Sequence, residues 1–181
     1  MAVPTKYQYL VNEPTTVELK EAIKHYGTLE HVGKGSNVNI LSWATEVGVK
    51  GWYADDDVPW CGLFKGVCAK RSGWLNKPKY DLLSALSWLV WGDKVIKGGE
   101  MLGDTLVFSR NGGGHVAYYV GEDKTHLHCL GGNQSNAVTI TRIAKDRLVG
   151  CRRAQWKIAQ PASVRKIYLT ADGSPVSTNE A

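Results

Sequence analysis

The chain has 181 residues, 43% of them hydrophobic and seven of them tryptophan, and its formal net charge is +5. This length and composition suffice for one substantial hydrophobic core, so we expect one folded domain over residues 1–160 and an extension over 161–181, part of it flexible. No segment has the roughly 20 apolar residues of a membrane span, and no apolar run of signal-peptide length follows Met1, which argues against a chain that crosses a membrane as a helix.

The first part of the chain predicts two amphipathic helices. Residues 15–18 have the spacing of a capping box, and the apolar stripe over 19–26 stops at Gly27. A second stripe over 40–47 stops at Gly48. Both helices precede the motifs that carry chemistry.

A third helix is predicted to begin at a cysteine. Pro59 suits the approach to a helix start, and Phe64 and Val67 continue one apolar face beyond Cys61. In the first helical turn, free backbone N–H groups and the helix dipole favour a thiolate, the nucleophilic form of cysteine. The alternative is a buried cysteine that acts only as a small hydrophobic residue.

The second half of the chain predicts strands. An apolar, tryptophan-containing segment over 82–91 is expected to form a fourth helix, after which period-two patterns and turn residues recur. We expect an α+β fold in which N-terminal helices pack on a central antiparallel sheet. The predicted strands cover 103–108, 115–120, 125–130, 138–142 and 148–152 in one meander, with 164–170 as an edge strand.

A histidine is placed at the start of one of these strands. Glycines 112–114 lead into His115, and the strand at 125–130 ends in Gly131-Gly132-Asn133-Gln134. A thiol on a helix, an imidazole on a strand and a polar residue from the next strand together form a nucleophile, a base and a group that orients the base.

In order along the chain, these motifs resemble the NlpC-type and CHAP cysteine amidohydrolases and peptidases. The similarity runs from about Glu18 to Arg153 and is greatest to a phage-associated branch that combines Asp-x-x-Pro-Trp-Cys, here residues 56–61, with Gly-Gly-Asn-Gln, here residues 131–134. The resemblance implies a papain-like catalytic domain that cuts amide bonds in the peptide part of bacterial peptidoglycan.

The resemblance also implies site residues. Cys61 matches the nucleophile and His115 the base. The third residue is less directly matched, because the glutamate of many CHAP relatives is replaced by Gly131. We predict Asn133 as this residue, with Gln134 as the alternative. Alternation along a strand puts only one of the two on the face of His115.

Three residues upstream of Cys61 are candidates for a substrate groove. We expect Trp60, Asp56 and Tyr53 to line it. For the two aromatic residues, buried packing is an equally good interpretation, and for Asp56 the more common role is to brace its loop by accepting backbone N–H bonds.

Two other functions remain open. The same catalytic residues would serve a cysteine deamidase or transglutaminase-like effector that acts on proteins, and a non-catalytic wall-binding or virion protein could keep the fold.

We expect a monomer made in a bacterial host cytoplasm, which reaches the wall after release or delivery by a holin, a virion or a secretion apparatus.

Charge and cysteine content limit the partners. Basic residues concentrated in the last third of the chain favour weak contact with anionic wall polymers or lipids, whereas no nucleic-acid motif is present. We expect no cofactor and no metal: His126 and His128 have a spacing that can bind a metal, but no clear third ligand accompanies them. The four cysteines are expected to be reduced, without a disulfide.

Overall fold

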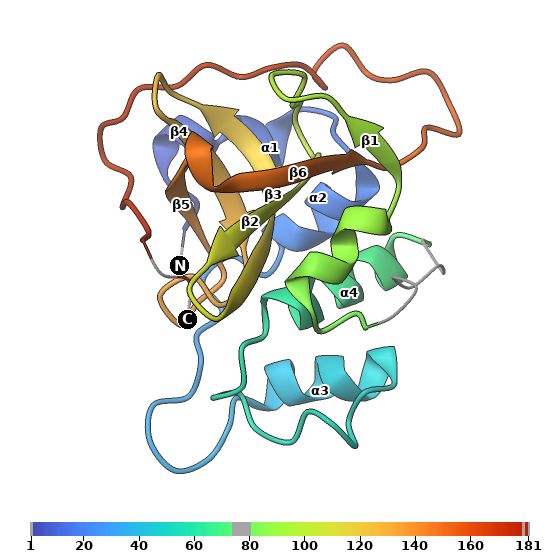
Figure 1. Cartoon of the computed structure of the whole chain (residues 1–181), viewed down its shortest axis with the longest axis vertical. Helices are drawn as coiled ribbons and strands as arrows, with labels where there is room; N and C mark the ends of the chain where they lie inside the picture. Colours follow the sequence, from blue (N-terminus) through green and yellow to red (C-terminus); the bar gives the residue numbers. More distant parts are fainter. Residues whose placement is uncertain (1, 74–80, 179, 181) are drawn as a thin grey trace.

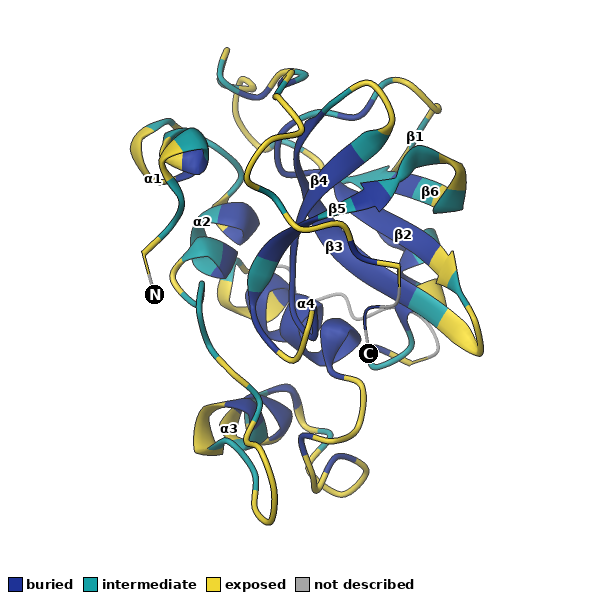
Figure 2. Cartoon of the chain, turned by 90° about the vertical axis from the view of Figure 1, so that its left-hand side faces the viewer, coloured by how far each residue is buried: buried dark blue, intermediate teal, exposed yellow. Residues whose placement is uncertain are grey.

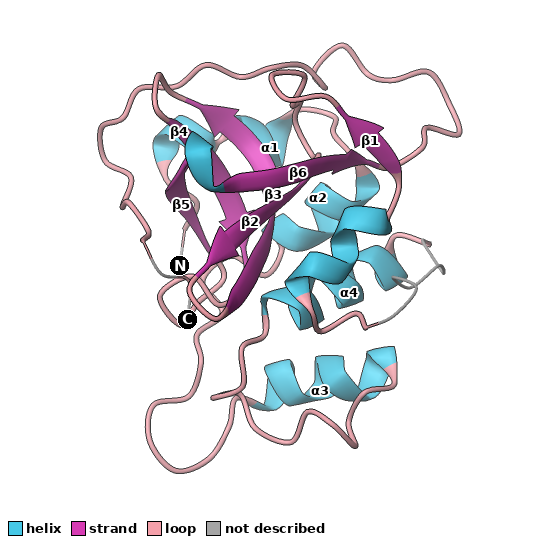
Figure 3. Cartoon of the chain, in the orientation of Figure 1, coloured by secondary structure: helices cyan, strands magenta, loops and turns pink. Residues whose placement is uncertain are grey.

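In the computed structural model, helices pack against one face of a six-stranded antiparallel sheet, so the α+β fold predicted from the sequence is confirmed (Figures 1 and 3). The structure describes residues 2–73, 81–178 and 180. Its α-helices are α1 (Tyr9–Asn12), α2 (Val17–Ile23), α3 (Val38–Val47) and α4 (Cys61–Arg71). Its 3-10 helices are η1 (Thr5–Tyr7), η2 (Ala85–Val90) and η3 (Lys145–Arg147). Its strands are β1 (Asp93–Val95), β2 (Thr105–Arg110), β3 (Gly113–Glu122), β4 (His126–Gly131), β5 (Thr139–Ala144) and β6 (Leu148–Arg153).

The strand order β1-β6-β2-β3-β4-β5 keeps the predicted meander from β2 to β5 but corrects the place of β6. We expected β6 to extend the meander beyond β5. It instead returns through η3 and pairs with β2 on the other side of the sheet. The short strand β1, which we did not predict, then pairs with β6.

The central strands are buried (Figure 2), and two clusters of apolar side chains pack on the sheet. Because side chains alternate along a strand, Val116 and Tyr118 of β3 pack toward the helices, whereas Ala117 and Tyr119 belong to a second, smaller cluster on the opposite face. The larger cluster holds α4 against the sheet. This packing fixes the first turn of α4 near the beginning of β3.

Three of the predicted helices form, as α2, α3 and α4, but α2 ends at Ile23 and not at Gly27 as we expected. Helix α2 is capped by Thr16, whose hydroxyl accepts the Leu19 N–H at 3.2 Å, but there is no capping box, because Glu18 is buried in an ion pair with Lys65. The segment predicted as a fourth helix forms only the 3-10 helix η2. Helix α3 ends, as expected, at Gly48, whose φ of 79° requires glycine.

The extension after residue 160 packs along the sheet in its described parts. No regular strand forms over 164–170; Tyr168 makes a single bridge to Glu122. Further on, Ser177 donates its N–H to the carbonyl of Arg142 in β5 at 3.0 Å, which covers the edge of that strand.

Among the residues that the structure describes, no helix is both long and apolar enough to cross a membrane.

Candidate active site

Cys61 is the first residue of α4, where the sequence predicts it. It follows Trp60 at the N-cap, and the next residue, Gly62, allows the chain at Leu83 to lie against the helix start: a Cβ on Gly62 would lie 2.2 Å from the Leu83 carbonyl oxygen. The glycine after the cysteine is therefore required by close backbone packing.

The thiol of Cys61 is buried, and this burial opposes the thiolate that the helix start was expected to favour. Only 4% of the residue is exposed, and burial raises the pKa of the thiol. The N–H groups of Val116 and Gly62 and the charge of Arg110 act in the opposite direction and favour the thiolate. Desolvation exceeds these effects, so the resting sulfur is a neutral thiol.

His115 lies next to Val116 near the start of β3 and is fully buried. Its Nε2 is 3.0 Å from Oε1 of Gln134, and its ring stacks on Phe108, the residue opposite it in β2, at 6.4 Å between centroids. Burial lowers the pKa of His115 to about 4, with Arg110 acting in the same direction. The imidazole is therefore neutral at physiological pH and can accept a proton.

The orientation of Gln134 sets the tautomer of His115. The Gln134 amide nitrogen donates to the carbonyls of Cys129 at 3.1 Å and Thr139 at 2.6 Å, which leaves its oxygen facing the imidazole. An amide oxygen only accepts, so Nε2 of His115 must carry the proton and Nδ1 the lone pair. Nδ1 is buried, and within the described residues it has no hydrogen-bond partner.

The contact with Gln134 corrects our choice of Asn133 as the orienting residue. Asn133 has a φ of 55°, and its side-chain oxygen is without a hydrogen-bond partner in the described part of the chain. Asparagine tolerates this left-handed conformation better than most residues, so the backbone turn accounts for its presence. Because of this turn, the alternation of strand β4 does not continue through Asn133. The side chain of Gln134, our alternative orienting residue, contacts His115.

No protein-family model and no curated protein matches this sequence. What supports a function is therefore the order of its motifs and the geometry of these side chains.

The three residues that we expected to line a groove are instead internal. Trp60 is buried and donates its indole N–H to Glu30 at 2.8 Å, and Tyr53 is buried and donates to the Val58 carbonyl at 3.0 Å. Asp56 is also buried and braces its loop, accepting the N–H groups of Asn37 at 2.7 Å and His31 at 3.0 Å. These contacts match the packing and bracing alternatives.

Arg110 is a site residue that sequence analysis missed. It ends β2, opposite Gly113, and its charge acts on both Cys61 and His115. Its Nε is buried and lacks a hydrogen-bond partner among the described residues. The register of the β2–β3 hairpin could have indicated Arg110. It lies two residues beyond Phe108, the strand partner of His115, and therefore on the same face of the sheet.

The other three cysteines are buried, and burial raises the pKa of each of their thiols. All four cysteines are free in this structure. Of the four, Cys61 is the one that begins a helix, and in the described residues no hydrogen bond joins it to His115.

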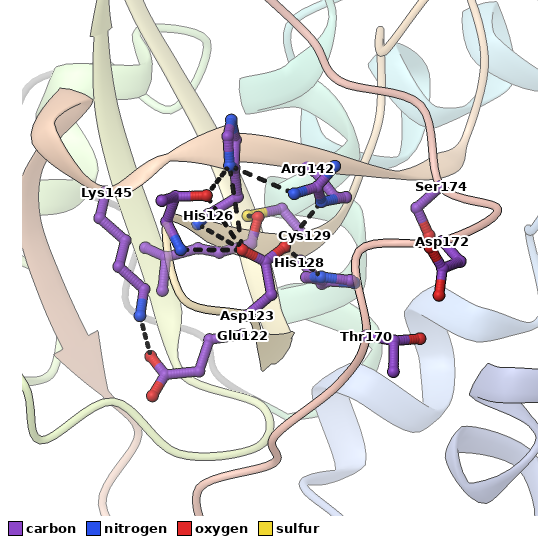
Figure 4. Close-up of polar contacts among 12 residues, drawn as sticks. Glu122, Asp123, His126, His128, Cys129, Arg142, Lys145, Thr170, Asp172 and Ser174 are labelled. Carbon is purple, nitrogen blue, oxygen red and sulfur yellow. Dashed lines mark hydrogen bonds and ion pairs between the residues drawn. The ribbon is translucent and has the colours of Figure 1, made fainter.

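His126 and His128 belong to a separate polar network (Figure 4). His128 is hydrogen-bonded through Nε2 to Asp123 at 3.0 Å and through Nδ1 to the Tyr7 hydroxyl at 2.6 Å, so both of its nitrogens are engaged. Asp123 also accepts from Arg142 at 2.7 Å. The network ties β4 and β5 to the N-terminal segment.

In the described part of the chain, one group of carboxylates is close enough to hold a metal ion. Single oxygens of Asp55, Asp56 and Asp57 lie within 4.8 Å of one another in the loop before α4. Asp56 already serves as the loop brace, and exposed acidic groups of this kind are common without a metal.

Proposed function

We propose that this protein is a thiol hydrolase that cleaves an amide bond in the peptide part of bacterial peptidoglycan. The observation that carries the proposal is the position of Cys61 in the first turn of α4, where the N–H of Val116 favours its thiolate. The residue before Val116 is His115, whose Nε2 contacts Gln134 and whose Nδ1 has no partner among the described residues. The motif order along the chain supports the same class of enzyme and a papain-like catalytic domain.

In the proposed reaction, the neutral pair reacts by general base catalysis. Nδ1 of His115 takes the proton of the Cys61 thiol as the sulfur attacks the amide carbonyl carbon. The resulting oxyanion lies at the N-terminus of α4, where the N–H of Cys61 can stabilise it. The imidazolium then gives its proton to the leaving amine as the C–N bond breaks.

The second half of the reaction releases the thioester. Water attacks the thioester carbon, His115 accepts a proton from this water, and the sulfur leaves and recovers a proton from the imidazolium. Gln134 keeps the imidazole in one tautomer through both steps, because its own amide is fixed by two carbonyls.

The test is release of soluble fragments from purified peptidoglycan. Cys61→Ala should lower the rate of release by at least about a thousandfold while the protein stays folded. His115→Ala should lose about as much activity. The double variant should lose no more, because the losses of residues in one catalytic unit are not additive. Cys68→Ala is the matched control on the same helix and should retain activity with lower stability. Near wild-type release by Cys61→Ala would overturn the proposal.

Mass spectrometry of the released fragments identifies the bond. New amino groups on wall peptides support an amidase or endopeptidase. Ammonia release from a protein glutamine, without wall fragments, would instead identify a deamidase, and sedimentation with the wall without cleavage would identify a binding protein.

A further inference from the structure

The C-terminal tail returns to the site that contains His115. From residue 170 the tail passes along the edge of β5, where Arg142 forms a bridge to Val176 (Figure 1). Glu180, near the end of this tail, is only 1% exposed. A carboxylate is rarely buried unless it is paired, so Glu180 needs a partner.

The partner is Arg147, at the end of η3. Its two terminal nitrogens bind both carboxylate oxygens of Glu180, at 2.8 and 2.7 Å, in the fork geometry by which arginine recognises carboxylates. Arg147 also donates from Nε to the carbonyl of Ser109 at 3.1 Å, which fixes the guanidinium over β2.

This arginine lies beside the catalytic strand. Ser109 is the register partner of Gly114, the residue before His115. The carboxylate of Glu180 raises the pKa of His115, whereas Arg110 and Arg147 lower it. Two guanidinium groups and one carboxylate leave an excess positive charge around His115.

We propose that Arg147, with Arg110 beside it, forms a carboxylate-binding subsite of the active site, and that Glu180 of the tail occupies this subsite in place of a substrate group. The substrate is then a peptide with a free carboxylate next to the amide that is cut. This assignment rests on the proposed thiol hydrolase function.

Two features of the subsite support a ligand rather than only a structural ion pair. Arg147 holds the Glu180 carboxylate beside the hairpin that carries His115, the proposed general base. An ion pair that only anchored the tail would not need this position. Arg110 keeps a buried Nε without a partner in the described residues, so the subsite has donor capacity that Glu180 does not use.

The test is binding of two synthetic stem tripeptides to the full-length Cys61→Ala variant, measured by calorimetry. Both are L-alanyl-γ-D-glutamyl-L-lysine with an amidated C-terminus, and they differ only in whether the glutamyl α-carboxylate is free or amidated. We expect about tenfold tighter binding of the free acid, because a bidentate charged contact is lost in the amide. Glu180→Gln should tighten binding of the acid further, since the intramolecular competitor is weakened.

Arg147→Met in the same background should bind the two peptides equally. If the methionine variant fails to fold, Arg147→Lys replaces it in the test. Lysine keeps the charge without the fork, so this variant should retain a reduced preference for the acid. Lys124→Met, an exposed basic residue on the β3–β4 turn, is the matched control and should change nothing. Thermal unfolding of each variant separates lost recognition from lost structure.

Equal binding of the two peptides by Cys61→Ala, no binding of either, or a preference that survives Arg147→Met would overturn the subsite. Wall hydrolysis by the wild type distinguishes this failure from failure of the proposed function. Acid-selective binding that depends on Arg147, in a protein that cuts no wall, would keep the subsite and remove the hydrolase assignment.

Discussion

Two buried polar clusters of this protein differ in how completely their hydrogen bonds are satisfied. One turn into α4, Lys65 pairs with Glu18, its ammonium lies 3.9 Å from the centre of the Trp91 ring, and Glu18 also accepts the Tyr118 hydroxyl at 3.1 Å. The second cluster contains His115 and Gln134, next to Val116, and it leaves Nδ1 of His115 buried without a partner in the described residues.

The difference separates a structural cluster from a candidate functional one. A buried charge is tolerated only when its partners are complete, as they are around Lys65. A buried acceptor left free costs stability, so the free Nδ1 of His115 is a group available for proton transfer.

The largest stability effect is expected from breaking the satisfied cluster. Lys65→Met leaves the carboxylate of Glu18 buried and uncompensated, and it should lower the free energy of unfolding by about 3–5 kcal/mol. Urea unfolding of the two proteins measures this. The Glu18→Leu/Lys65→Met double variant is the control and should recover part of the loss, since an apolar pair needs no partner. A loss below about 1 kcal/mol for Lys65→Met would show that the cluster is not structural.

The next effect comes from the pH dependence of the catalytic cluster. In the unfolded chain His115 titrates near its ordinary pKa of 6.5, whereas in the fold burial and the nearby Arg110 and Arg147 lower its pKa to about 4, against the opposing charge of Glu180. As pH falls from 6.5 toward 4, the unfolded state takes up a proton that the folded state does not. Stability is therefore complete above pH 6.5 and falls by about 3 kcal/mol toward pH 4.

Urea unfolding of the wild type and His115→Gln at pH 7.5 and pH 4 isolates this contribution. Other titrating groups, including His25 and His128, whose pKa values burial also lowers, are present in both proteins and cancel in the difference. Equal losses in the two proteins would show that His115 is not desolvated as the structure has it.

Sequence patterns predicted the elements of the site better than their contacts. The start of α4 and the strand of His115 follow from local signals, a proline before a helix and glycines before an apolar run. The meander from β2 to β5 follows from turn residues. The position of β6 does not, because pairing with β2 depends on a long-range choice between two sheet edges.

The contacts missed at the site are also long-range or conformational. Burial of Cys61 depends on packing of the segment near Leu83 against a distant helix, and Glu180 comes from a tail without periodicity. Strand alternation correctly allowed only one of Asn133 and Gln134 to face His115. It could not decide between them, because the left-handed backbone at Asn133 breaks the alternation.

The smallest effect that we predict distinguishes these two neighbours. Gln134→Ala removes the acceptor that holds Nε2–H of His115, so the ring can rotate or change tautomer, and kcat should fall by about a hundredfold with little change in KM. Asn133→Gly is the matched variant, since glycine keeps the left-handed backbone, and it should retain most activity. Both are measured as initial rates of fragment release from purified peptidoglycan. If Asn133→Gly is inactive and Gln134→Ala is active, then Asn133 orients the base during catalysis, and the contact with Gln134 serves only to hold the β4–β5 turn.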